Sequence, residues 1–445
     1  MKQVKLYVTM LFVVSTLSLA SIRSLAGGFL IYEQGAAAQG MAGTFVSVAN
    51  DPTAVYYNPA GLAFQNGIGA TAGMSLILTT LKTKPKHVDY STGHVTTGPS
   101  IAADNGLFPI PFAYVSASLG HGVAAGLGVF PHLGLGISWP GGKQWDTGRQ
   151  EIEKVSLQVL TVNPCISWSP ARWISFGLGF DAAKGSIEFQ RGIDFMREGW
   201  DSVDPSNRFG SAELGGSGWG FGMNFGVLFK PMDELSLGIH YRSRFNLALS
   251  GKGSFDVPPS FADTLPDQDL SMEITMPDII AAGIAYRPLN WLLLQLEVTQ
   301  VMWSTYDVLY VELNKTPENN MRMEQDFQDT ATFRFGLQLD GAGIVQGLDG
   351  FKVRTGFIFD LTPVPSTTLG PALPDGNRYD WSFGLGYTIS KQFPLTMNLA
   401  YILIYFNRDE DVKLDSNNVP VNHWPAAYRG LYHSIGLDVS YKFDL

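Results

Sequence analysis

The chain is short of charge, of cysteine and of long apolar runs. Charged residues make up 16% of its 445 positions, whereas soluble domains carry roughly a quarter. Beyond the N-terminus no stretch of about 18 residues is apolar without interruption, which excludes transmembrane helices. Cys165 is the one cysteine, so no disulfide framework can form within the chain. A net charge of −10 with few basic residues leaves no basic face for nucleic acid.

Glycine and aromatic residues are abundant instead, with 49 Gly, 28 Phe, 17 Tyr and 10 Trp. Residues 431–443 and 379–390 alternate apolar with polar side chains. A period of two residues is that of a β-strand. In a bilayer such strands must close into a barrel, because an open edge would leave backbone groups unpaired in hydrocarbon. The apolar parity then faces lipid and the polar parity faces a lumen.

Alternating segments of this kind recur along the whole chain. They cover residues 68–82, 108–119, 122–137, 153–168, 173–190, 216–230, 234–255, 269–287, 290–311, 331–340, 350–360, 379–390, 393–407 and 431–443. Short and long connections alternate between them, as in bacterial barrels, which have short periplasmic turns and long extracellular loops. The sequence therefore predicts an all-β fold, a transmembrane antiparallel β-barrel of fourteen strands with both ends in the periplasm.

Residues 1–26 carry Lys2 and Lys5, a short apolar core and a small-x-small site at 24–26. This pattern predicts a cleaved signal peptide and export from the bacterial cytoplasm.

Residues 27–66 are rich in small residues and do not alternate, and Asn58-Pro59 is a signal for a helix start. A barrel of fourteen strands encloses more space than its own side chains fill. We therefore predict an N-terminal helical or irregular plug (hatch) at 27–66, inside a barrel formed by 67–445. Charged side chains of lumen parity, among them Asp181, Arg242, Arg244 and Glu297, either clasp this plug or only hydrate a pore.

Several motifs resemble the FadL/TodX family of outer-membrane transporters for hydrophobic compounds. They are Gly27-Gly28-Phe29, Asn58-Pro59-Ala60, WISFGLGF at 173–180, FDLTPVP at 359–365 and LPDGNR at 373–378. The resemblance covers nearly the whole mature chain. It implies a protein of the bacterial outer membrane that is inserted by the barrel-assembly machinery among lipid and lipopolysaccharide. It also implies passive uptake of hydrophobic molecules, above all long-chain fatty acids, and we expect a monomer.

The strand predicted at 173–190 changes character along its length. On its lumen parity, small and polar residues give way to Ile187 and Phe189 and then to Arg191. Apolar walls that end in a fixed cation suit a fatty acid. The resemblance places the same three residues at ligand-pocket positions, with Arg191 as the carboxylate partner, and a bound ligand would shift the plug near Phe29. The alternative is an ordinary arginine at a loop base with two packed apolar neighbours.

The second motif of the family suggests Arg378 as a further ligand residue. Alternatively, Arg378 serves only a structural pair with Asp375, which is close in sequence. Where the family has another basic pocket residue this chain has Met323, with Arg322 beside it. This departure weakens the idea that two cations grip a carboxylate.

The strand predicted at 122–137 contains Gly126, Gly128 and Pro131. Proline cannot donate a ladder hydrogen bond and glycine adds no side chain, so this strand should bend or open. In the family an inward kink of this strand makes a lateral opening to the outer leaflet. The alternative is that Pro131 lies above the bilayer and the glycines only admit the plug.

No catalytic constellation, metal-ligand cluster or cofactor motif stands out in the sequence. We therefore expect no enzyme, no metal and no cofactor. The leading interpretation is uptake of hydrophobic molecules with lateral exit at the third strand. One alternative is an aromatic or aliphatic hydrocarbon channel, in which Arg191 would be idle. Another is a structural or adhesive barrel that transports nothing.

Overall fold

The computed structural model describes residues 27–141, 145, 148–195, 209–390, 392–417 and 419–443, so the predicted signal peptide lies outside the described residues. No helix in these ranges is long and apolar enough to cross a membrane.

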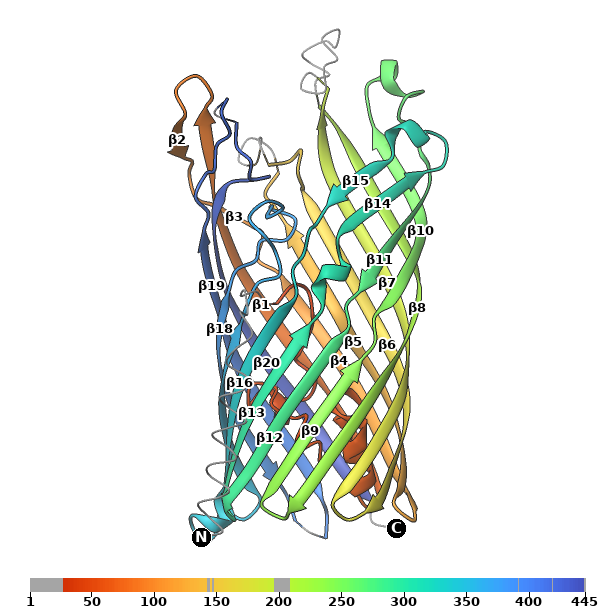
Figure 1. Cartoon of the computed structure of the whole chain (residues 1–445), viewed down its shortest axis with the longest axis vertical. Coiled ribbons are helices and arrows are strands. Elements are labelled where there is room, and N and C mark those ends of the chain that lie inside the picture. Colours follow the sequence, from red (N-terminus) through yellow and green to blue (C-terminus); the bar gives the residue numbers. More distant parts are fainter. Residues whose placement is uncertain are drawn as a thin grey trace.

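One antiparallel sheet makes up almost the whole described chain (Figure 1). Its strands are β1 Ile68–Asp89, β2 His94–Thr97, β3 Ile101–Ala102, β4 Leu107–Gly120, β5 Val123–Ser138, β6 Lys154–Ala171, β7 Ile174–Asp194, β8 Phe209–Met232, β9 Leu235–Arg242, β10 Phe245–Asp256, β11 Gln268–Met276, β12 Ile279–Leu289, β13 Leu292–Val301, β14 Val308–Leu313, β15 Met321–Glu324, β16 Thr330–Asp340, β17 Phe351–Asp360, β18 Arg378–Thr388, β19 Leu395–Asp409 and β20 Ala426–Phe443. Short 3-10 helices lie between strands at η4 Pro259–Phe261, η5 Trp303–Thr305, η6 Pro317–Asn319 and η7 Gly341–Gly343.

The sheet closes because the first long strand pairs with the last, from Ile68 opposite Phe443 to Pro85 opposite Ala426. β2 and β3 are short additions to β1. The other strands make fourteen passes through the described wall, since β9 with β10, β11 with β12, β13 with β14 and β15 with β16 are each one interrupted pass. The predicted fourteen-stranded barrel is confirmed.

Alternation sorts the side chains as predicted. Leu296, Phe383 and Leu437 are each 57% exposed on the outer face, whereas Ser382 and Ser434 are fully buried on the inner face. Short connections gather at one end of the barrel together with the end of β20, and long loops gather at the other (Figure 1). We call these the turn end and the loop end.

Several strands differ from their predicted bounds. β1, β8 and β20 extend further toward the loop end, where strands leave the region in which alternation reports lipid contact. Two neighbouring passes also break at the same height. There Asp278 accepts hydrogen bonds from the Arg244 backbone N–H at 2.9 Å and from the Tyr241 hydroxyl at 2.7 Å.

The plug, residues 27–66, lies inside the lower and middle barrel and is drawn in red in Figure 1. It contains α2 Ala36–Gln39, α3 Ala54–Tyr57 and the 3-10 helix η1 Pro59–Phe64. Its own small core is made by Met41, Phe45 and Tyr57. Helices of four residues are too short to be stable alone, so the barrel wall must hold them.

Carboxylates and a guanidinium of the wall hold the plug backbone. The Glu297 carboxylate accepts the N–H groups of Phe45 at 3.0 Å and Val46 at 3.1 Å. Asp438 accepts the Ala36 N–H at 2.6 Å. Arg242 pairs with Asp181 at 2.7 Å and donates to the Tyr56 carbonyl at 3.2 Å. These wall charges clasp the plug.

Arg244 is an exception among the charges expected to clasp the plug. Its side chain is 61% exposed and pairs with Asp278 at 2.7 Å. The expectation for Arg244 is wrong because the break between β9 and β10 at 243–244 shifts it out of the alternation.

We predict that Glu297→Gln loosens the plug and raises the single-channel conductance in planar bilayers. The substitution keeps the side chain's shape but loses charge-assisted hydrogen bonds, which contribute about 1.5–3 kcal/mol, and it leaves Arg334, 3.6 Å away, without its carboxylate. Glu318→Gln, an exposed loop change, is the matched control. Conductance equal to that of the unaltered protein would show that Glu297 does not latch the plug.

Candidate functional site

The barrel wall has a gap between β4 and β5. The two strands pair only from Gly120 opposite Val123 to Ala113 opposite Val129. Toward the loop end, residues 107–112 of β4 continue to pair with β1, and residues 130–138 of β5 continue to pair with β6. At the loop end the gap is closed where Asp104 N–H donates to the Ser138 carbonyl at 2.8 Å.

Two prolines lie on the β4 side of the gap. Thr79 N–H donates to the Gly106 carbonyl at 3.1 Å and Ser118 N–H to the Gly67 carbonyl at 2.8 Å, so the even-numbered amides of β4 face β1. The odd-numbered amides face the gap, and Pro109 and Pro111 are odd-numbered. Because proline has no N–H, both remove a donor that would be unpaired at membrane depth.

On the β5 side of the gap, the first residues of the plug form hydrogen bonds with some of the backbone groups of β5 that β4 leaves unpaired. Leu30 forms a β-bridge with Leu133, flanked by hydrogen bonds from Gly134 N–H to the Phe29 carbonyl at 3.0 Å and from Ile31 N–H to the His132 carbonyl at 3.2 Å. The β5–β6 register shifts between Pro131 and Leu133. β5 therefore bends inward and pairs with the plug in place of β4.

A cavity of about 520 Å³ occupies this region. Inward-facing side chains line one part of it, among them Ile77, Leu81, Ile110, Leu157 and Val159. Outward-facing residues line another part, namely Pro109, Pro111, Ser156, Gln158 and Leu160. A single cavity therefore runs from the part of the lumen nearer the loop end, through the gap, to the outer, lipid-facing side of the wall. We call it the upper cavity.

Phe29 forms part of the cavity floor. It is 4% exposed and makes edge-to-face contacts with Trp303 at 4.7 Å and Tyr306 at 5.6 Å between ring centroids. Such aromatic pairs contribute about 0.5–1.5 kcal/mol beyond burial. The plug segment that pairs with β5 is thus also anchored in an aromatic cluster of the opposite wall.

Arg378 also lines the cavity, but its charge is already paired. Its Nε donates to Asp360 Oδ2 at 3.1 Å, and its Nη2 donates to the same oxygen. Asp375 accepts instead from the Thr362 hydroxyl at 2.7 Å and from the Gly28 N–H at 3.3 Å. The predicted Arg378–Asp375 pair is therefore replaced by an Arg378–Asp360 pair. The pKa of Asp375 is raised because the effect of burial exceeds the opposing effect of the nearby Arg378 charge.

Ile187, Phe189 and Arg191 lie outside the cavity lining. Ile187 is buried in the large apolar cluster that fills the upper barrel, and Phe189 packs against it. Arg191 is half-buried opposite Ala212 of β8, and its side chain has no hydrogen bond or ion pair to another described residue. Arg322, which lies beside Met323 at the family's second basic position, is 61% exposed and pairs with Glu324 at 2.6 Å.

Gly126 and Gly128 lie below the gap and admit the plug. A Cβ at Gly126 would come within 2.7 Å of Leu62 and one at Gly128 within 2.9 Å of Val55. Of the residues predicted for the lateral opening, Pro131 alone lines the cavity.

The Asn58-Pro59-Ala60 motif holds the plug. Asn58 Nδ2 donates to the carbonyls of Val46 at 2.8 Å and Val227 at 3.1 Å. The Ala60 carbonyl accepts from the Ser175 hydroxyl at 2.8 Å. The wall has glycine where the motif touches it, since a Cβ at Gly177 would stand 2.3 Å from Ala60 N.

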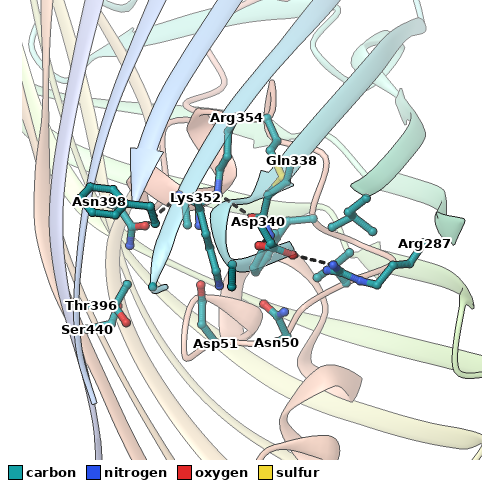
Figure 2. A pocket seen from close by; sticks show the side chains of 18 residues that line it. Asn50, Asp51, Arg287, Gln338, Asp340, Lys352, Arg354, Thr396, Asn398 and Ser440 are labelled. Carbon is teal, nitrogen blue, oxygen red and sulfur yellow. Dashed lines mark hydrogen bonds and ion pairs between the residues drawn. The ribbon is translucent and has the colours of Figure 1, made fainter. Parts of the chain in front are cut away.

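A second cavity, of about 420 Å³, lies between the plug and the wall toward the turn end. Figure 2 shows Lys352 of β17 reaching toward Asp51 of the plug, while Arg354 of the same strand donates to Gln338 and Asn398 and Arg287 reaches Asp340. The upper cavity shares no lining residue with it. The body of the plug separates the two spaces.

Comparison with known proteins identifies the architecture. The family model for "Outer membrane protein transport protein (OMPP1/FadL/TodX)" matches residues 17–443. The chain belongs to this family. It is 23% identical to a putative outer membrane protein of Neisseria meningitidis serogroup B, over 94% of this chain and 95% of that one. It is 22% identical to the long-chain fatty acid transport protein of Escherichia coli K12, over 70% and 74% of the two chains.

Solved structures of the family share the fold. A Pseudomonas aeruginosa FadL homologue aligns with a TM-score of 0.81 at 19% identity, over 94% of this chain and 100% of that one. The Pseudomonas putida toluene transporter TodX aligns with a TM-score of 0.70 at 17% identity, over 93% and 100%. The chain is therefore an outer-membrane barrel of a family that transports hydrophobic compounds. Its turn end faces the periplasm, as in other bacterial barrels.

Sequence reasoning missed the β4 side of the gap. The signal was present as Pro109 and Pro111 in LFPIPFAY, two prolines of one parity in a strand that otherwise alternates. Within a sheet proline is confined to edges and bulges, so this pattern predicts a strand with one unpaired edge.

We predict that Gly128→Trp displaces the plug and does not block the gap. Overpacking of this kind costs about 1–3 kcal/mol of stability. The variant barrel should therefore unfold at a lower temperature than the unaltered protein, as measured by the change in electrophoretic mobility between folded and heat-unfolded samples. Ala282→Trp, on the exposed outer face of β12, is the control. A Cβ at Gly128 would also come within 2.8 Å of Tyr114 of β4. Equal melting of the two variants would show that Val55 and Tyr114 can make room for the new side chain.

Proposed function

We propose that this protein takes up hydrophobic small molecules by passive diffusion and releases them sideways through the gap between β4 and β5. The observation that carries the proposal is the cavity of about 520 Å³ lined by both inward-facing and outward-facing residues of the same strands. Known ligand pockets fall in the range of about 300–1,000 Å³ and are mostly apolar. A molecule in this cavity could reach the lipid side of the wall without passing the plug.

The downward route is closed in this conformation. The plug body that separates the two cavities is held by wall residues of the buried pairs Arg242–Asp181 at 2.7 Å and Arg334–Glu297 at 3.6 Å. Taking an apolar ligand past buried charges would break their mutual compensation, which is costly inside a protein. Lateral exit avoids this cost.

The polar groups of the cavity offer no unpaired cation to the carboxylate of a free fatty acid. Arg378 is the single cationic side chain among the described residues that line it, and Asp360 already neutralises that charge. The hydrocarbon-channel alternative drawn from the sequence is therefore our first candidate. The TodX structure, titled a toluene transporter, offers a precedent within the family.

Long-chain fatty acids are the second candidate. Arg191 is unpaired among the described residues and follows Ile187 and Phe189 along the apolar inner face of β7. Relatives in Escherichia coli and Salmonella typhi are named long-chain fatty acid transport proteins. A fatty acid would bind above the cavity with its carboxylate at Arg191.

We predict that Gln158→Trp strongly reduces uptake of a neutral hydrocarbon into cells that depend on this protein. Gln158 is exposed on the outer face of β6 and lines the lateral end of the cavity. A Trp there fills the exit without touching the plug. Ala282→Trp again serves as the control for an outward-facing Trp on another strand. Unchanged uptake by a folded Gln158→Trp barrel would exclude the lateral route, and no uptake by the unaltered protein would favour a structural or adhesive barrel.

We predict that Arg191→Ala leaves the binding of dodecane unchanged and has little effect on dodecanoate. If Arg191 did hold a carboxylate, the lost charge-assisted hydrogen bond would be worth about 1.5–3 kcal/mol, or about ten- to a hundredfold in affinity. Titration of both ligands against the purified protein distinguishes these cases. A selective loss for dodecanoate would establish the fatty-acid candidate.

A further inference from the structure

The charged side chains that line the upper cavity are mostly acidic. They are Glu33, Asp104, Asp375 and Arg378. Arg378 is bound to Asp360, whose side chain is fully buried. The positive charge of Arg378 is therefore already balanced by the negative charge of Asp360. A ligand that enters the cavity therefore meets an excess of carboxylate groups.

Glu33 belongs to the plug and is 8% exposed. Its Oε2 accepts the Tyr32 N–H at 3.0 Å, and no lysine or arginine among the described residues forms an ion pair with it. A carboxylate offers about four acceptor sites. The Glu33 carboxyl thus keeps acceptor capacity that the described protein does not fill.

Asp375 presents a similar group from the loop at 361–377. It is 5% exposed, and its three hydrogen bonds come from Gly28 N–H, the Thr362 hydroxyl and Gly376 N–H. None of these donors carries a charge. Asp375 and Glu33 thus place two acidic acceptors on one cavity, beside the plug segment that pairs with β5.

We propose that this cavity selects hydrophobic ligands whose polar end donates hydrogen bonds, such as alkylammonium ions and alcohols, and discriminates against those that end in a carboxylate. The inference rests on the lateral uptake proposed above and names its ligand class. An ammonium or hydroxyl donor pairs with Glu33 or Asp375, whereas a carboxylate has no proton to donate to their oxygens and is repelled by the negative charge that they carry when ionised. Apolar side chains such as Leu133, Leu157 and Val159 receive the alkyl chain of either ligand alike.

The test uses ligands of equal chain length: dodecylammonium, dodecanol and dodecanoate. Binding is measured to the full protein in nanodiscs of zwitterionic lipid, with the signal of empty nanodiscs subtracted. We expect dodecylammonium to bind at least tenfold more tightly than dodecanoate, with dodecanol between them. Dodecanoate binding as tightly as dodecylammonium would overturn the proposal.

Substitutions assign the preference to the two carboxyl groups. Glu33→Gln and Asp375→Asn keep the side-chain shape and remove the charge, so each should narrow the ammonium-to-carboxylate ratio at least threefold. Glu318→Gln is the exposed control and should leave the ratio unchanged. A ratio that neither cavity substitution alters would overturn the proposal, even if the unaltered protein prefers dodecylammonium.

Failure of the broader function would look different. If dodecanol neither binds nor enters cells through the unaltered protein, lateral uptake itself is refuted. If dodecanol binds and Gln158→Trp blocks its entry while dodecanoate outcompetes dodecylammonium, then only the preference for donors is refuted.

Discussion

The rest of this structure depends on the rule that backbone groups at membrane depth must be paired. An orphaned N–H or C=O in hydrocarbon costs several kcal/mol, yet the wall opens between β4 and β5 beyond Ala113 and Val129. Pro109 and Pro111 remove donors from one edge, and plug residues 29–31 pair with the other edge. The gap therefore depends on the plug, because moving the first residues of the plug would leave backbone groups at the edge of β5 unpaired.

Charge inside the barrel serves the plug more than any ligand. Glu297, Asp438 and Arg242 bind plug backbone groups, and Arg378 is held by Asp360 close to Gly27. The hydrogen bonds with Glu297, Asp438 and Arg242 satisfy plug backbone groups that have no partner within its short helices. The plug can therefore remain helical in four-residue segments.

The candidate site could be predicted only in part. Phe29, Pro131 and Arg378, which the sequence analysis singled out, line the cavity. Ile187 and Phe189 lie outside the cavity lining, in an apolar cluster that also contains lining residues such as Leu157, and Gly126 and Gly128 touch the plug. The acidic pair Glu33 and Asp375 was not foreseen, since one lies in the plug and the other in a loop more than three hundred residues later.

By itself the sequence determined the barrel, because a two-residue period, closure and strand count follow from local alternation. It also indicated that residues 27–66 form none of the long strands of the wall. Only the tertiary structure decided where the wall opens, which charges are already paired and which faces border one cavity. These depend on contacts between distant segments, such as Leu30 with Leu133 and Arg378 with Asp360. Alternation assigns each residue to a face of the wall, but it does not predict which residue of another segment it will contact across the lumen.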